Sequence, residues 1–248
     1  MFKHKLKASL IHLAISALIV FSFLIFVRSY WYPEPFFSIS GLVTILIMIV
    51  AVDLVLGPLL TFIVYKPQKP TLKFDITTIA TIQIAALSYG MYTVYQAHPL
   101  YVAYAIDRFS PIDTSEVFPS NARFEELKKS KLTGPTLVYL QKPTDRAEIS
   151  KVTMEVMSGK ADLDARTEYY FPLDQRIDEV IANSLNIEAF AKRPEHKAKL
   201  DAFLAKYGQK LEDYAFLPLV GKEKDVLWAF NRKTREPVDI VEISPWSS

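Results

Sequence analysis

The chain has 248 residues, half of them apolar, with no cysteine and a formal net charge of +2. A disulfide framework and cysteine-based metal or redox chemistry are therefore excluded. The charges are unevenly distributed: residues 1–97 carry seven Lys or Arg and three acids, whereas the remainder carries twenty-two basic and twenty-four acidic residues. This asymmetry predicts two parts that lie in different solvents, lipid and water.

Three apolar stretches in the first part are each long enough to cross a membrane as a helix. They cover residues 8–27, 39–65 and 74–97, and about 20 helical residues span the hydrocarbon core of a bilayer. The first stretch shows no polar face, which a core helix of a soluble protein would normally have. We predict a three-helix transmembrane region over residues 1–97 and a separate domain over residues 98–248.

A cleaved signal peptide is the alternative interpretation of the N-terminus, because "KHKLK" supplies a positively charged start. The apolar run is too long for a signal peptide and lacks an A-x-A cleavage site, so an uncleaved anchor is predicted. Orientation follows from Lys and Arg in short loops. Lysines gather at the N-terminus and in the loop "KPQKPTLK", whereas the loop "RSYWYPEPFFSIS" has one Arg and an aromatic group suited to a membrane interface. We expect a multi-pass protein of the bacterial inner membrane, with a cytoplasmic N-terminus and a periplasmic C-terminal domain.

Asp53 lies in the middle of the second apolar stretch, where an acid must face protein or water instead of lipid. Gly57 lies on the same helix face and permits close approach of another backbone, and Pro58 predicts a kink. Three interpretations stay open for Asp53. It can join the helices of its own bundle, contact a partner helix, or belong to a proton or ion path.

The third stretch runs antiparallel to the second, which brings Gln83 and Ala86 to the depth of Asp53. Two faces of small and polar residues suit packing against helices. One face has Thr77, Thr81, Ala85 and Ser88, and the other has Gln83, Ala86 and Gly90. We expect one face to hold the bundle together and the other to receive a foreign transmembrane helix.

The C-terminal part shows alternating and aromatic-rich runs typical of strands, separated from amphipathic runs typical of helices. Strands are predicted at 100–109, 135–140, 214–220, 226–230 and 238–243, and helices from 145, over 177–185 and over 194–207. Short turns between the last three strands indicate an antiparallel meander. We therefore predict an α+β domain with a mainly antiparallel sheet.

Motifs of catalysis are not found in this domain. No H-E-x-x-H, G-x-S-x-G or glycine-rich phosphate loop occurs, and basic clusters are too short for nucleic acid. We expect no catalytic residue, no metal, no cofactor and no nucleic-acid partner. The aromatic run Tyr169, Tyr170 and Phe171 has a loop-like context, which makes it a candidate contact for a protein partner, whereas Trp228 and Phe230 alternate on one strand face as core residues do.

Several segments resemble the type IV pilin accessory proteins of the TfpX/TfpZ, FimB-like family. They are "WYPEPFF", "VDLVLGPLLTFIVYKPQKPTLKFD", "YGMYTVYQAHP" and the tail "YAFLPLVGKEKDVLWAFNRKTREPV". The resemblance implies an inner-membrane accessory factor, without enzymatic activity, that binds a cognate pilin and modulates pilus assembly, stability or dynamics. Its expected partners are the major pilin, other pilus assembly proteins and membrane lipids.

Two other functions remain open from the sequence. A membrane-anchored periplasmic sensor would bind a ligand in the C-terminal domain and act through a partner, because the cytoplasmic segments are too short for an effector domain. A membrane enzyme or transporter would use Asp53, although three helices are few for a transport path.

Overall fold

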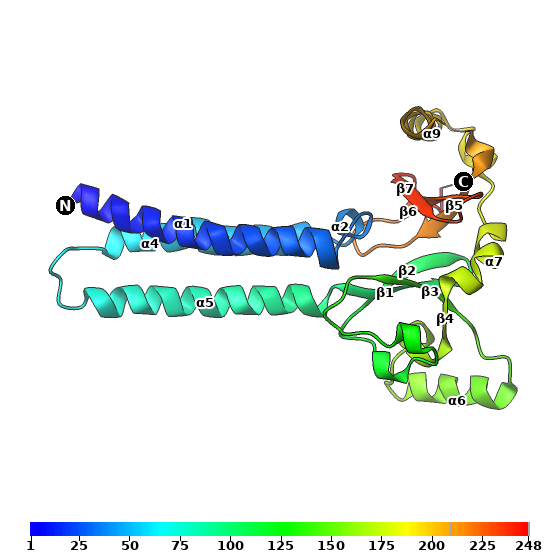
Figure 1. The fold of residues 1–248 in the computed structure, drawn as a ribbon, viewed down its shortest axis with the longest axis horizontal. Helices are drawn as coiled ribbons and strands as arrows, with labels where there is room; N and C mark the ends of the chain where they lie inside the picture. Colours follow the sequence, from blue (N-terminus) through cyan, green and yellow to red (C-terminus); the bar gives the residue numbers. More distant parts are fainter. Residues whose placement is uncertain (209, 248) are drawn as a thin grey trace. The chain divides into compact units, whose positions relative to one another are not determined.

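A computed structural model describes residues 1–208 and 210–247, which form two compact units (Figure 1). The first unit contains Met1–Tyr30 and Gly41–Ala97, and it is entirely helical apart from its loops. The second contains Trp31–Ser40 and the chain from His98 onward. The loop after the first helix thus belongs to the C-terminal domain, although it precedes that domain by nearly sixty residues.

Long helices make up the first unit. They are α1 (Phe2–Phe26), a continuous helix composed of α3 (Leu42–Val50), the π-helical turn η2 (Ala51–Leu56) and α4 (Gly57–Val64), and α5 (Leu72–Gln96). A second π-helical turn, η1 (Val27–Trp31), extends α1. In this unit α1 packs on α4, and α5 packs on α3 and α4.

Two of these helices are long and apolar enough to cross a membrane. The spans are Phe2–Trp31 and Leu42–Val64. Within the described residues, α5 is not in this class, because threonine, tyrosine and glutamine interrupt its apolar run. Of the three predicted spans, 8–27 and 39–65 correspond to these two helices, whereas the stretch 74–97 does not qualify as a span.

The loop between α1 and α3 is a buried part of the second unit. Its short helix α2 (Phe36–Ile39) places Phe36 and Ile39 in the core, with the Phe36 ring 5.7 Å from that of Trp228. Trp31 stacks on His98 at 4.8 Å, and its Nε1 donates to the carbonyl of Leu132 at 3.0 Å. The predicted aromatic membrane belt is thus wrong for Trp31, which is buried in the domain.

A seven-stranded mixed sheet organises the second unit, with the order β4-β3-β1-β2-β5-β6-β7. The strands are β1 (Pro99–Ala105), β2 (Arg108–Asp113), β3 (Thr136–Leu140), β4 (Tyr170–Pro172), β5 (Tyr214–Leu219), β6 (Val226–Asn231) and β7 (Pro237–Val241). The pairs β1–β3 and β2–β5 are parallel, which corrects the expectation of a mainly antiparallel sheet.

One predicted strand, 100–109, is in fact a tight hairpin. β1 ends at Ala105, β2 begins at Arg108, and Ile106 between them has a φ of 65°. A β-branched residue rarely adopts this left-handed conformation, so the sequence gives no turn signal there. The strand β2 then joins the second half of the sheet through the single register pair Phe109↔Leu219.

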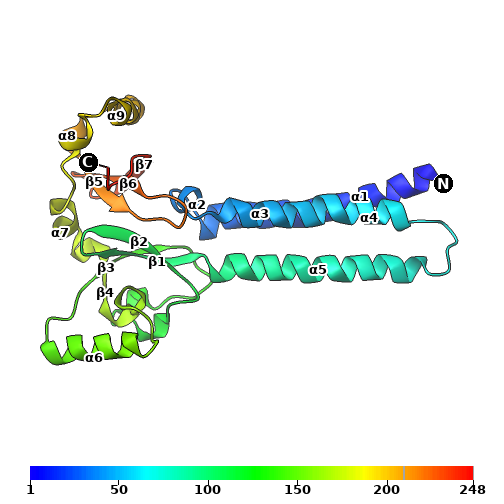
Figure 2. The same cartoon turned by 180° about the vertical axis from the view of Figure 1, so that it is seen from behind.

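Helices and 3₁₀ turns cover the sheet. The helices are α6 (Arg146–Met157), α7 (Ile177–Ala182), α8 (Ile187–Phe190) and α9 (Pro194–Tyr207). The 3₁₀ turns are η3 (Pro119–Asn121), η4 (Glu125–Leu127), η5 (Leu163–Ala165), η6 (Thr167–Tyr169), η7 (Leu173–Gln175) and η8 (Leu211–Asp213). Within this unit, α6 lies near β4 and α8 and α9 lie near β5–β7 (Figure 2).

The core of the domain has three parts. One joins β1, β2, β5 and β6 with α7 and α2, so that the inserted loop completes it. A second packs the loops around η4 and η5 against β1 and β3, and a third packs α8 and α9 against β5 to β7. The aromatic rings of Phe109, Trp228 and Phe230 meet in the first part, as predicted for the last two.

Candidate functional site

A polar cluster inside the helical unit begins at the π-helical turn η2. Pro58 has no N–H group and therefore cannot bond to the carbonyl of Leu54. The chain accommodates this with a widened turn in which the N–H of Gly57 donates to the carbonyl of Val52, five residues earlier. Pi-helical turns of this kind frequently mark functional sites. Here the turn carries Asp53, whose side chain is buried.

Gln83 of α5 lies directly against Asp53. Its Nε2 atom donates to Oδ1 of Asp53 over a long distance of 3.5 Å. The other two oxygens, Oδ2 of Asp53 and Oε1 of Gln83, are buried and have no hydrogen-bond partner among the described residues. The two side chains are only 4 % and 7 % exposed, so these acceptors are enclosed by the helices.

Gly57 makes this contact between α4 and α5 sterically feasible. A Cβ atom at position 57 would lie 1.8 Å from Nε2 of Gln83, far inside van der Waals distance. The sequence placed Asp53 and Gly57 on one helix face, and that face also carries the buried Thr61. The structure therefore assembles Asp53, Gly57, Pro58 and Gln83 at one level of the bundle.

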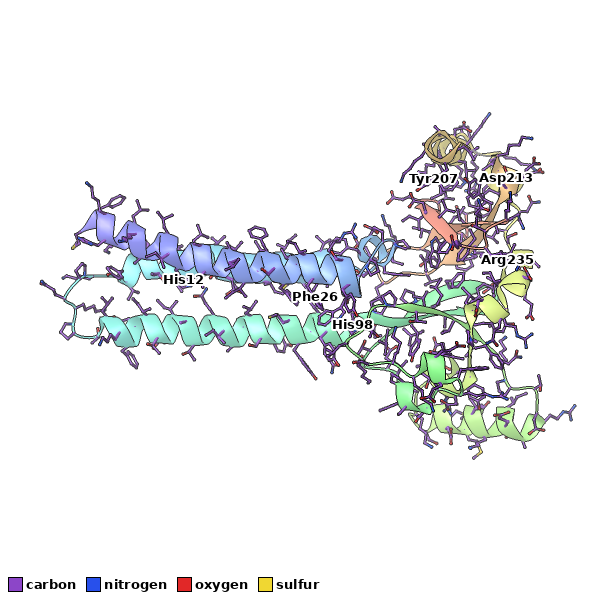
Figure 3. The ribbon with its side chains drawn as sticks, viewed as in Figure 1. His12, Phe26, His98, Tyr207, Asp213 and Arg235 are labelled. Carbon is purple, nitrogen blue, oxygen red and sulfur yellow. The ribbon has the colours of Figure 1, made fainter. Side chains whose placement is uncertain are left out.

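A polar row on α1 faces the same cluster, and the sequence analysis missed it. His12 contacts Thr61 through Nδ1 and Oγ1 at 2.7 Å, and Oγ of Ser9 donates to the carbonyl of Pro58 at 2.8 Å (His12 is labelled in Figure 3). Ser16 lies one turn further along. The spacing of residues 9, 12 and 16 follows one helix face, so the expectation of no polar face was wrong.

A cavity of about 630 Å³ lies between α1, α4 and α5 and contains this cluster. Asp53, Gln83, His12 and Thr61 supply its polar wall, and Lys7 lines it nearer the N-terminus of α1. The rest of the lining is mainly aliphatic. Its aliphatic members include Ile11, Ile15, Ile19, Ala80, Ile84 and Leu87. The arrangement is an apolar cleft with acceptor oxygens at one depth, which suits recognition more than reaction.

The other residues of α5 that were predicted as contacts have different surroundings. Gly90 packs on α3, where a Cβ atom would lie 2.8 Å from Cγ1 of Ile49. Ala86 is exposed, so it does not pack inside the bundle, and its role as a contact for a partner helix stays a prediction. The face with Thr77, Thr81, Ala85 and Ser88 is also exposed.

In the aromatic run of the C-terminal domain, Tyr169 ends the 3₁₀ turn η6, and Tyr170 and Phe171 belong to the edge strand β4 instead of a loop. Tyr170 is fully buried and its hydroxyl donates to the carbonyl of Asp164, so it is a core residue and cannot contact a partner. Tyr169 donates to Glu148 at 2.9 Å, and burial, together with that carboxylate, raises the pKa of Tyr169 to about 12.

Phe171 is half-buried and its ring lies 4.9 Å from the ring of Phe124. The guanidinium groups of Arg123 and Arg176 lie over the same ring, at 5.7 and 5.6 Å. Tyr169 and Phe171 are therefore the members of the predicted aromatic contact that keep an accessible surface. Among the described residues, no group of three or more His, Cys, Asp or Glu is arranged to hold a metal ion.

Comparison with known proteins finds similarity to proteins named for fimbrial assembly. The family model described as "Fimbrial assembly protein FimB" matches residues 1–41. The chain is 37 % identical over 89 residues to the fimbrial assembly protein of serogroup I of Dichelobacter nodosus, which is 35 % of each chain. It is 33 % identical over 113 residues to the serogroup E1 protein of the same organism, covering 45 % of this chain and 44 % of that one.

A third relative is covered more completely. The chain is 36 % identical over 89 residues to the fimbrial assembly protein of serogroups C1 and C2 of Dichelobacter nodosus, which is 35 % of this chain and 68 % of the relative. The matches to the first two relatives span less than half of their length. No solved structure matches the chain. The resemblance found in the sequence is confirmed, and the chain belongs to the family of FimB-like fimbrial assembly proteins.

Proposed function

We propose that this protein is an inner-membrane accessory factor of type IV pili that binds the cognate pilin and modulates pilus assembly, stability or dynamics. The observation that carries the proposal is the similarity to proteins named for fimbrial assembly. The protein acts by binding, with no reaction and no cofactor of its own. Other pilus assembly proteins and membrane lipids are its further proposed contacts.

The path of the chain supports a multi-pass topology. The loop Trp31–Ser40 belongs to the same unit as the chain after His98, so both lie on one side of any membrane that the helices cross. If Leu42–Val64 leaves that side, α5 must return to it, because β1 begins three residues after α5 ends. The lysines at the N-terminus and between α4 and α5 favour the cytoplasm for the opposite side. We therefore propose a periplasmic location for the C-terminal domain.

A pilin has the parts that this architecture suits. Pilins are held in the inner membrane by one apolar helix and carry a globular periplasmic head. The cleft of the helical unit offers a wall for the helix, and the second unit offers surfaces such as Phe171 for the head. Two weak contacts that are linked in one chain strengthen each other through effective concentration.

The proposal is tested in the bacterium that carries this gene. Deletion is expected to change the number, length or retraction of surface pili, and re-expression of the intact chain is expected to restore them. A photo-reactive residue at Ile84, which lines the cleft, is expected to crosslink to pilin more strongly than one at Ile82, which points outward. Unchanged pili after deletion, together with no pilin crosslink at either position, would contradict the proposal.

A further inference from the structure

The cleft of the helical unit contains two hydrogen-bond acceptors that lack donors. Oδ2 of Asp53 and Oε1 of Gln83 are buried, and neither has a partner in the part of the chain that the structure describes. Burial of an unpaired polar atom destabilises a fold, so native structures seldom leave one without a compensating partner. On α1, Nδ1 of His12 contacts Thr61 and the hydroxyl of Ser9 donates to the carbonyl of Pro58, so these two groups are used within the bundle.

The depth of these acceptors limits what can supply the donor. Asp53 lies at the midpoint of the span Leu42–Val64, about 16 Å from either end at 1.5 Å per residue. The hydrocarbon core of a bilayer is about 30 Å thick, so this position is close to its centre. Lipid tails carry no hydrogen-bond donors at that depth. A donor from outside the chain that reaches both oxygens is therefore carried there by a protein segment that crosses the membrane.

The walls of the cleft suit one side of such a segment. Ile11, Ile15 and Ile19 recur at helical spacing along α1, and Ala80, Ile84 and Leu87 do so along α5. An apolar helix can place its side chains between these two rows. Asp53 and Gln83 line the same cleft, so a single polar residue near the middle of that helix would lie beside them.

We infer that the cleft binds a transmembrane helix of a partner protein that carries a hydrogen-bond donor near its middle, and that Asp53 and Gln83 select for this donor. A cationic donor such as an ammonium group complements both the carboxylate and the amide oxygen. A hydroxyl satisfies one of them, and a purely apolar helix satisfies neither. The inference rests on the proposed function for the biological role of the helix, because it names the chemistry that the partner's helix needs.

Model helices test this selectivity directly. The purified full-length chain is placed in lipid vesicles with a labelled Leu/Ala transmembrane peptide whose central residue is Lys, Ser or Leu, and binding is measured by energy transfer. Interhelical hydrogen bonds contribute about 0.6 to 2 kcal/mol, so the Lys peptide is expected to bind roughly three- to thirtyfold more tightly than the Leu peptide. The Ser peptide is expected to fall between them.

Variants assign the preference to the two acceptors. Asp53→Asn is expected to remove the advantage of Lys over Ser, and Gln83→Leu to reduce the preference of both over Leu. Thr81→Ala removes a hydroxyl from the exposed face of α5 and is expected to change nothing. A photo-reactive group at Ile15, which lines the cleft, is expected to capture the Lys peptide, whereas one at the outward Leu18 is not.

Three results would overturn the inference. The first is equal binding of the Lys, Ser and Leu peptides, and the second is a preference for the Lys peptide that survives Asp53→Asn. The third is energy transfer between two copies of the chain that depends on Asp53 and excludes the peptide, because the occupant would then be a second copy. These vesicle results are independent of the pilus assays. A selective cleft in a strain with unaffected pili would contradict only the proposed function, and altered pili with an unselective cleft would contradict only this inference.

Discussion

Gly57 and Gln83 form the closest contact between α4 and α5. Gly57→Ala is expected to push the Gln83 side chain away from Asp53, because the added Cβ would overlap Nε2. Overpacking of this kind costs about 1 to 3 kcal/mol. The thermal stability of the detergent-solubilised helical unit, followed by helical circular dichroism, is expected to fall.

Shortening Gln83 provides the control for that substitution. The double variant Gly57→Ala, Gln83→Ala is expected to recover most of the loss, because the overlapping atom is gone. An equal loss in the single and double variants would mean that the backbone of α5, and not the Gln83 side chain, limits the approach.

Lys129 gives the domain a distinctive response to pH. Burial lowers the pKa of Lys129 to about 8, and its ammonium group donates to the carbonyl of Gly134 and the hydroxyl of Thr136. Between about pH 8 and its ordinary pKa of 10.5, the unfolded chain binds more protons at this site than the folded chain does. The free energy of unfolding therefore contains a contribution from Lys129 that rises with pH in this window.

The measurement compares pH 7.5 with pH 9.5, and the partial ionisation of tyrosines in the unfolded chain at pH 9.5 is the same for both chains compared. For each chain, the midpoint temperature of thermal unfolding at pH 7.5 is expressed relative to its own value at pH 9.5. This relative midpoint is expected to be lower for the native chain than for Lys129→Met. Tryptophan fluorescence serves as the signal, because all three tryptophans (Trp31, Trp228 and Trp246) lie in the second unit. Parallel pH profiles of the two chains would contradict the assignment.

Some residues of the polar cluster can be predicted from the sequence and others cannot. Helical spacing and depth predict that Asp53, Gly57 and Gln83 lie close together, because a straight helix fixes which residues share a face. The partners on α1 were missed, since His12 stands in a run with no formal charge and its face was read as apolar. Tyr170 was misplaced for a different reason: burial of an edge strand depends on the loops that cover it.

At the scale of elements, the inserted loop Trp31–Ser40 contributes to the core of a domain that begins far along the chain. Phe36→Ala is expected to destabilise that domain by about 3 to 5 kcal/mol, because it removes a buried ring packed on Trp228. For a domain of this size, the loss corresponds to a fall of roughly 10 °C in the unfolding midpoint. Tryptophan fluorescence during heating measures it.

Phe37→Ala is the matched control, because the neighbouring ring is only partly buried. Its effect is expected to be clearly smaller. A fragment that begins at residue 98 should show the same defect as Phe36→Ala, and addition of a peptide covering residues 31–40 should raise its unfolding midpoint. No response to the peptide would mean that the loop is accessory to the core.

Most secondary structure was predictable because amphipathic helices and aromatic-rich strands carry strong periodic signals. The helix α9 was expected over 194–207 and lies at Pro194–Tyr207. The parallel pairings were not predictable from the sequence. The connection from β1 and β2 to β3 contains no long crossover helix, which would have indicated parallel strands. The inserted loop was hidden as well, because aromatic residues beside a membrane helix also fit an interfacial belt.

At the scale of the whole molecule, the absence of cysteine allows a direct test of the proposed topology. A single cysteine at Ser150 on α6 is expected to react with a membrane-impermeant maleimide once the outer membrane is opened. A single cysteine at Pro70, between α4 and α5, is expected to react only after the inner membrane is opened. Both positions are exposed. Equal labelling of the two positions before the inner membrane is opened would contradict three membrane passes.

The insertion of Trp31–Ser40 into the C-terminal core also fixes when the protein can finish folding. Phe36 is made early, whereas its packing partner Trp228 is made almost last. At 5 to 20 residues per second, the interval between them is roughly 10 to 40 s. During that interval the apolar loop lacks its packing partners in the core. The domain therefore closes only after synthesis is nearly complete, and an interrupted chain keeps Phe36 and Ile39 uncovered.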